Sequence, residues 1–282
     1  MTINRRDFLK TLGAATATLS GIKLHGKEIT QNPEFYGVLF DANYCSGCQK
    51  CEIACAETYN LPLPEETDKP VIAETRKLNE NRRTVVNKFK TDKGELFVKK
   101  QCMHCNQPAC ASACLTAAMK KTVEGPIIWR ENKCMGCRFC MLSCPFDIPQ
   151  FEYHSANPKI SKCTMCFEKL KNGERPACVK ACPEEALLFG TRRALIKEAR
   201  RRIHKHPEKY VDHIYGEREA GGTSWLYLSP VPFEQIGFTK KIDTEPYPEL
   251  TKGFLYSVPF VFVLWPALML GMSKANDGEE NS

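Results

Sequence analysis

Sixteen of the 282 residues are cysteines, and their spacing is the first pattern in this chain that could do chemistry. A cytosolic protein of ordinary composition carries far fewer thiols. The cysteines form four groups of four, and the first and third groups have the spacing C-x2-C-x2-C-x3-C. Between the second and third cysteines there are four residues in the second group and eleven in the fourth. The groups are Cys45, Cys48, Cys51 and Cys55; Cys102, Cys105, Cys110 and Cys114; Cys134, Cys137, Cys140 and Cys144; and Cys163, Cys166, Cys178 and Cys182.

This spacing is typical of ligands for 4Fe-4S clusters. Three cysteines can hold one cubane from a tight loop, while the fourth, which is expected to start a helix, reaches a neighbouring cluster. We therefore predict four 4Fe-4S clusters, with all sixteen cysteines as iron ligands. Proline follows Cys144 and Cys182, whereas Ala56 and Leu115 follow the other two fourth cysteines. Proline binds no iron, so this difference leaves the predicted count unchanged.

Two other uses of the thiols fit the spacing less well. Structural zinc would use separated C-x2-C pairs, and would make the chain a zinc-stapled interaction module. A disulfide framework is conceivable in an exported protein, but cysteines two or three residues apart rarely meet disulfide geometry. Gly47 and Gly136, inside C-x-G-C, are expected either to bring amide donors near the cluster or to serve as ordinary turn residues.

The charge balance agrees with bound clusters. The formal charge of +7 counts every cysteine as neutral. Four oxidised clusters would contribute about −8, so the basic residues are interpreted mainly as counter-charge. The run Arg200 to Arg202 is interpreted as a solvated or partner-facing surface, and no nucleic-acid partner is predicted.

The elements that must position these ligands are predicted as an α+β fold. Two ferredoxin-like units, each with two clusters, would occupy residues 35–190, with an insertion at 56–101. A hairpin is predicted from Thr84–Lys90 and Glu95–Lys100, and short strands are predicted at Gly125–Arg130 and Ala186–Phe189.

The region after the last cysteine reads differently. Thr191 is a candidate N-cap for a basic helix over Arg192–His204. This helix opens a segment, 191–250, that otherwise reads as a loop-rich linker, with one strand candidate at Trp225–Leu228.

The N-terminal segment, 1–26, resembles a twin-arginine export signal. Arg5 and Arg6 precede Phe8 and an apolar run. Asn4 stands where Ser or Thr is usual and no A-x-A site follows, so cleavage stays open. The alternative is an amphipathic N-terminal helix. A protein that is loaded with clusters in the cytoplasm must cross the membrane folded, which agrees with this export route.

The C-terminal stretch 254–272 carries no charge and is predicted to be a transmembrane helix. Nineteen helical residues span about 28 Å, close to the hydrocarbon thickness of a bilayer. Pro259 and Pro266 are tolerable there if neighbouring helices satisfy the freed carbonyls. The alternative is a buried core helix. With the cluster domain on the periplasmic side of the bacterial inner membrane, the tail 273–282 stays inside.

No catalytic motif accompanies the cysteines. The sequence has no G-x-G-x-x-G, no P-loop and no Ser-His-Asp order, and its six histidines are scattered. His104, between two ligands, is expected to donate a hydrogen bond or to lie on the surface. We therefore predict a non-catalytic electron-transfer subunit, and an autonomous enzyme would instead show turnover without partners.

Taken together, these features resemble the four-cluster ferredoxin-like subunits of the dimethyl sulfoxide reductase superfamily. The segments Lys99–Cys105, Cys137–Phe146 and Tyr215–Thr223 look like the iron-sulfur subunit of hydrogenase-2-type uptake hydrogenases. The beta subunit of exported formate dehydrogenase, a molybdopterin oxidoreductase, is a similar alternative. Either resemblance implies a catalytic partner on the outer side, a NiFe hydrogenase or a molybdopterin subunit, and an integral membrane subunit that reacts with quinone.

The resemblance also implies how the groups share clusters. Groups one and four would hold one pair, and groups two and three the other. The implied ligand sets are Cys45, Cys48, Cys51 and Cys182; Cys163, Cys166, Cys178 and Cys55; Cys102, Cys105, Cys110 and Cys144; and Cys134, Cys137, Cys140 and Cys114.

Overall fold

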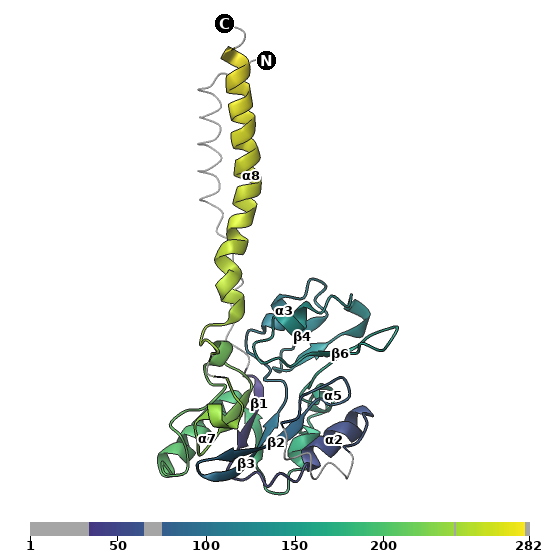
Figure 1. Cartoon of the computed structure of the whole chain (residues 1–282), viewed down its shortest axis with the longest axis vertical. Coiled ribbons are helices and arrows are strands. Elements are labelled where there is room, and N and C mark those ends of the chain that lie inside the picture. The colour runs from purple at the N-terminus through teal and green to yellow at the C-terminus, as the bar shows by residue number, and fades with distance from the viewer. Residues whose placement is uncertain (1–33, 65–74, 240, 280–282) are drawn as a thin grey trace. The chain divides into compact units, whose positions relative to one another are not determined.

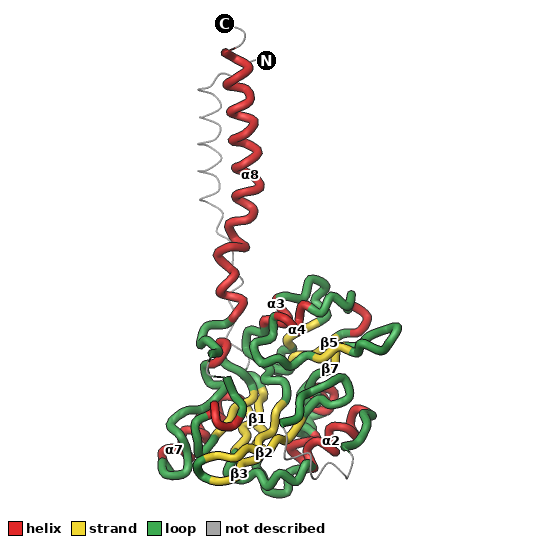
Figure 2. Tube along the Cα trace, viewed as in Figure 1, coloured by secondary structure: helices red, strands yellow, loops and turns green. Residues whose placement is uncertain are grey.

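The computed structural model describes residues 34–64, 75–239 and 241–279. The predicted twin-arginine segment lies outside these residues. A three-stranded sheet forms the centre of the cysteine-bearing domain (Figures 1 and 2). In it, β1 (Tyr36–Asp41) pairs antiparallel with β8 (Leu187–Thr191) and parallel with β9 (Trp225–Leu228).

The strand β1 is buried on both faces because helices and loops cover both sides of the sheet. Val38, Leu39 and Phe40 are each at most 1% exposed. Continuous apolar runs of this kind are typical of strands covered on both faces. β8 and β9 confirm two predicted strands, whereas β1 was not among the predicted elements.

Residues 205–250, predicted as a loop-rich linker, also contribute to the core. All four residues of β9 are at most 1% exposed, and Phe233 and Ile236 pack in the same hydrophobic cluster as Trp225. The segment therefore completes the central sheet as well as connecting it to the C-terminal helix.

The basic helix is confirmed as α7 (Arg192–Lys205), which packs on the sheet through Leu195 and Ala199. The side chain of Thr191 makes no capping hydrogen bond. The first backbone N–H of the helix instead donates to the carbonyl of Phe35, at 2.7 Å.

The predicted hairpin is confirmed as β2 (Val85–Thr91) and β3 (Gly94–Lys100), with Thr91 opposite Gly94 at the turn. Two smaller hairpins lie in the second half of the domain, and the Gly125–Arg130 strand is confirmed within one of them. The other short elements, apart from the cysteine-bearing helices, are β4 (Met119–Lys121), β5 (Ile127–Trp129), β6 (Gln150–Phe151), β7 (Ile160–Ser161), α5 (Phe167–Lys171), and the 3-10 turns at Glu131–Lys133, Glu219–Gly221 and Phe233–Ile236.

The C-terminal helix, α8 (Tyr247–Glu279), is longer than the predicted span and contains both prolines (Figure 1). The most apolar 18-residue window of its stretch Tyr247–Ser273 has a mean hydropathy of 1.8, and none of that window is buried. A core helix of a soluble protein would be covered, so the exposure favours the membrane span over the alternative.

Candidate functional site

Each cysteine group is built around a short helix whose second residue is the third cysteine. These helices are α2 (Lys50–Tyr59), α3 (Ala109–Ser112), α4 (Phe139–Leu142) and α6 (Ala177–Lys180). The third cysteine, rather than the fourth, therefore starts the helix. The fourth lies four residues later in every group. In α2 one helical turn, a rise of about 6 Å, separates Cys51 from Cys55. The other three helices end two residues before the fourth cysteine.

The turn between the first two cysteines of each group has a left-handed residue at the same place. Gly47 and Gly136 have φ of 72° and 71°, and His104 and Met165 have φ of 51° and 54°. At Gly47, a Cβ would also lie 2.4 Å from the ring of Phe97, whereas nothing lies within 4 Å of a Cβ at Gly136. The glycine is therefore required by both conformation and space at Gly47, and by conformation alone at Gly136.

Backbone amides donate to thiols at two places. In the turn of group four, the N–H of Met165 donates to Sγ of Cys163 at 3.3 Å. After the last cysteine of group two, the N–H of Ala118 donates to Sγ of Cys114 at 3.1 Å. Burial raises the pKa of Cys114, but hydrogen bonds from backbone amides and from the Thr116 hydroxyl outweigh it, so the net shift is downward. Such donors stabilise thiolates, the form that binds iron.

A thiol of group four joins those of group one. Cys45, Cys48, Cys51 and Cys182 line one small cavity. Burial raises the pKa of Cys45 to about 11, and repulsion from Cys182 and Cys48 adds to this shift.

The reciprocal grouping brings Cys55 to group four. Burial raises the pKa of Cys55 to about 12, and the neighbouring thiolates of Cys163 and Cys166 contribute. Burial likewise raises the pKa of Cys178 to about 11, and Cys166 and Cys55 act in the same direction.

Groups two and three interleave in the same manner. Burial raises the pKa of Cys110 to about 12, with contributions from Cys102 and Cys144. Burial raises the pKa of Cys140 to about 11, and the contributing thiolates are Cys114, Cys134 and Cys137. Burial raises the pKa of Cys105, and the nearby thiolates of Cys102, Cys144 and Cys110 raise it further. These neighbourhoods agree with the ligand sets that the resemblance implies, and the sets themselves stay a prediction.

The described thiols form no single-ion site and no disulfide. Within the described ranges, no three Cys, His, Asp or Glu side chains converge tightly enough to hold one metal ion. Tetrahedral zinc would need its sulfurs about 2.3 Å from the metal. All sixteen cysteines are free thiols, so the disulfide framework is wrong.

Buried lysines provide positive charge beside these thiols. Lys99 and Lys162 are 2% and 3% exposed. Burial lowers the pKa of Lys121 to about 8, although the thiolates of Cys105 and Cys102 oppose this shift. From the sequence, the basic residues as a whole were interpreted as counter-charge to the clusters. Nothing in the residue pattern distinguished these lysines from exposed ones. Their burial beside cysteines indicates an anionic group at these sites.

His104 is buried, so the prediction that it lies on the surface is wrong. The hydrogen bond that its ring makes is accepted, not donated. Its Nδ1 accepts the N–H of Ile127 at 2.9 Å. Burial lowers its pKa well below the usual value, and Lys162 and Lys121 add to the shift. The neutral ring therefore carries its proton on Nε2, which is buried and has no acceptor in the described part of the chain. An unmatched buried donor in a ligand loop also fits a cluster, whose sulfur atoms accept hydrogen bonds.

Comparisons with known proteins agree with this geometry. A family described as a 4Fe-4S dicluster domain matches residues 94–192, and the twin-arginine translocation signal matches residues 2–20. A protein of Nitratidesulfovibrio vulgaris is 42% identical over 280 residues, covering 95% of this chain and 76% of that protein.

Two relatives have informative names. Hydrogenase-2 operon protein HybA of Escherichia coli O157:H7 is 31% identical, with 86% of this chain and 85% of that protein covered. The nitrate-inducible formate dehydrogenase iron-sulfur subunit of Escherichia coli is 29% identical, with 86% and 87% covered.

Proposed function

Because this chain belongs to the ferredoxin-like iron-sulfur subunits of the dimethyl sulfoxide reductase superfamily, we propose that it relays electrons through four 4Fe-4S clusters between a catalytic subunit and a quinone-reactive membrane subunit. The chain is an electron-transfer subunit of an oxidoreductase complex, not a catalytic one. It is exported by the twin-arginine route and anchored by one C-terminal helix. A bound cluster would take up and release one electron at a time.

The exchange of the fourth cysteine between groups carries this proposal. Cys182 lines the same cavity as three thiols of group one, and Cys55 lies beside those of group four. In each group the third and fourth cysteines are four residues apart and would bind different clusters, so the two clusters of a pair would be neighbours. Cys163, a ligand in the first pair, is buried next to Cys102, a ligand in the second pair. This supports a continuous path for electrons from the first pair of clusters to the second.

Two exposed cysteines suggest where electrons enter and leave. Cys48 and Cys137 are exposed, whereas the other cysteines are buried or half-buried. They are the second cysteines of groups one and three, and so belong to different pairs. Each pair would thus have one cluster near the surface, where a partner can approach.

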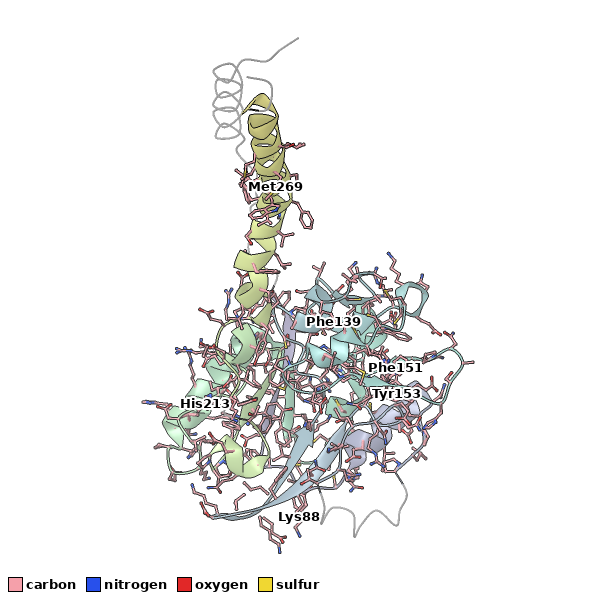
Figure 3. The ribbon with its side chains drawn as sticks, turned by 45° about the horizontal axis from the view of Figure 1, so that its top comes forward. Lys88, Phe139, Phe151, Tyr153, His213 and Met269 are labelled. Carbon is pink, nitrogen blue, oxygen red and sulfur yellow. The ribbon has the colours of Figure 1, made fainter. Side chains whose placement is uncertain are left out.

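The surface at the Cys137 end is apolar. Met135, Phe139 and Leu142 are 63%, 51% and 82% exposed, and Figure 3 shows Phe139 with Phe151 and Tyr153 on the same half of the domain. Large exposed apolar groups of this kind mark contact sites for other proteins. This supports a partner subunit docked over the outermost cluster of the second pair.

A NiFe uptake hydrogenase is the proposed catalytic partner. The likeness to the hydrogenase-2 operon protein, 31% identical over 86% of this chain, supports this choice. A formate dehydrogenase-O iron-sulfur subunit is equally identical, but over only 67% of the chain. The alternative is the beta subunit of a membrane-bound formate dehydrogenase or another molybdopterin oxidoreductase.

The deciding experiment is purification of the complex from membranes. Hydrogen-dependent quinone reduction is expected, with about sixteen iron and sixteen acid-labile sulfide per chain of this subunit. Formate-dependent reduction without hydrogen activity would select the alternative. Four zinc ions and no sulfide would contradict the clusters themselves.

A further inference from the structure

Lys99 is an ammonium buried in the first half of the domain without a carboxylate partner. Its Nζ donates to the hydroxyl of Thr84 and to Oε1 of Gln101, the latter at 3.0 Å, and both acceptors are neutral. The Trp225 ring lies 5.0 Å from Nζ. No described Asp or Glu forms an ion pair with Lys99. A lone buried charge is costly, so another group must balance it.

The nearby buried carboxylate cannot serve as this counter-charge. Glu52, which follows Cys51, accepts from Arg76 at 2.6 Å and from the N–H of Val86 at 2.6 Å. Arg76 and Glu52 thus form a closed ion pair. Glu184 lines the same cavity as Lys99, but it is exposed and forms no ion pair with it. Among the described residues, the cysteines therefore supply the buried negative charge beside Lys99.

Those cysteines belong to both ligand sets of the first pair. Lys99 lines the cavity shared by Cys45, Cys51 and Cys182. Trp225, whose ring lies 5.0 Å from Nζ, packs in the same buried cluster as Cys178, a ligand of the neighbouring set. The charge of Lys99 also acts on Cys178, Cys55 and Cys163, whose pKa values it lowers against the larger effect of burial. The ammonium therefore lies close to both sets at once.

A hydrogen-bond chain holds the ammonium in this position. Nε2 of Gln101 donates to the Tyr227 hydroxyl at 2.5 Å, which leaves Oε1 facing Lys99. The Tyr227 hydroxyl donates to the carbonyl of Lys99 at 3.1 Å. Gln101 and Tyr227 are both 1% exposed, so water does not compete for these groups.

We propose that Lys99 is the shared counter-charge of the two clusters in the first pair and raises the reduction potential of both. This rests on the proposed function. Reduction adds a negative charge to a cluster, and a fixed cation nearby stabilises the reduced form more than the oxidised form. The ligands of the second pair have Lys121 and Lys162 near them, although Lys162 also donates to the carbonyl of Cys163. The potentials of the second pair should therefore not depend on Lys99.

The test replaces Lys99 in the full chain within the membrane complex. Lys99→Gln removes the charge but keeps a hydrogen-bonding end, and Lys99→Met removes both. Redox titration followed by electron paramagnetic resonance should show two clusters shifted to more negative potentials and the other two unchanged. Lys100→Met is the matched control, because Lys100 is the next residue along the strand and is exposed.

The outcomes separate this inference from the proposed function. Unchanged potentials in variants with full iron content would overturn the role of Lys99 and leave the relay intact. A shift of one cluster alone would overturn the shared role. Loss of the first-pair iron in both variants would make Lys99 an assembly residue and also overturn the proposal. Absence of iron and sulfide from the unmodified complex would instead refute the proposed function.

Discussion

The thiols must change protonation state when iron binds. Burial raises the pKa of Cys45, Cys55 and Cys178 to about 11 or 12, so the cluster-free sites are protonated at neutral pH. Iron binds thiolates, so loading must release these protons, and higher pH favours it. The buried lysines and amide donors reduce this cost where the thiolates form.

Exchange of the fourth ligand can be tested with single cysteine variants. Cys182→Ser should open the cluster of group one, although Cys182 follows group four in sequence. Alkylation followed by mass spectrometry should then label Cys45, Cys48 and Cys51, while Cys163 and Cys166 stay protected.

The reciprocal variant is the control for this prediction. Cys55→Ser should expose Cys163, Cys166 and Cys178 and leave Cys45 protected. Labelling confined to the mutated cysteine's own group would show that each group closes its own cluster.

The two C-x-G-C turns should differ in their tolerance of a side chain. Gly136→Ala should cost about 1–2 kcal/mol for the left-handed conformation alone. Gly47→Ala should cost about 1–3 kcal/mol more, because its Cβ would meet the Phe97 ring. The measurement is the denaturant concentration at which cluster absorbance is lost. Equal midpoints for the two variants would mean that Phe97 moves aside freely.

At the scale of elements, short local patterns were predictable and long-range ones were not. The β2–β3 hairpin has alternating residues around a tight turn, and α7 has a start signal, so neighbouring residues suffice to predict both. β1 is an apolar run whose partners are about 150 and 190 residues away, and no local pattern identifies them. The buried lysines escaped prediction for the same reason, since burial depends on distant segments.

The cysteine-bearing helices should depend on iron. α3, α4 and α6 have four residues each, far below the length at which a helix is stable in water. Removal of iron with a chelator under reducing conditions should leave the domain largely unfolded. Circular dichroism and hydrogen exchange would measure this, and a cooperative thermal transition in the iron-free chain would count against it.

At the scale of the whole molecule, the chain combines an export signal, a cluster domain and an anchor, and each can be removed separately. Changing Arg5 and Arg6 to Lys should leave cluster-loaded protein in the cytoplasm, because the export machinery reads the paired arginines. Cell fractionation with iron analysis measures this. The variant should also be expressed without its partners, since a partner with its own signal could carry it. Normal export of the chain alone would remove the twin-arginine assignment.

Truncation after Lys252 should release the cluster domain from membranes, because it removes the exposed apolar side chains of residues 254–272. Iron content should be unchanged, since every cysteine precedes residue 252. Quinone reduction should fall sharply, while reduction of an artificial dye by the catalytic partner should survive. Truncated protein that still sediments with membranes and reduces quinone would show that docking comes from the cluster domain.

The parallel pairing of β1 with β9 also sets the order of events during synthesis. The sheet cannot close until Leu228 has been made, although β1 ends at Asp41. α8 begins at Tyr247, so at about 5–20 residues per second the ribosome needs only about 1–4 s to reach the anchor. The anchor therefore follows the completed sheet within seconds, a time comparable to that in which domains fold. Any cluster loading that takes longer occurs with the apolar helix already present, and that helix then needs shielding from the cytoplasm until export.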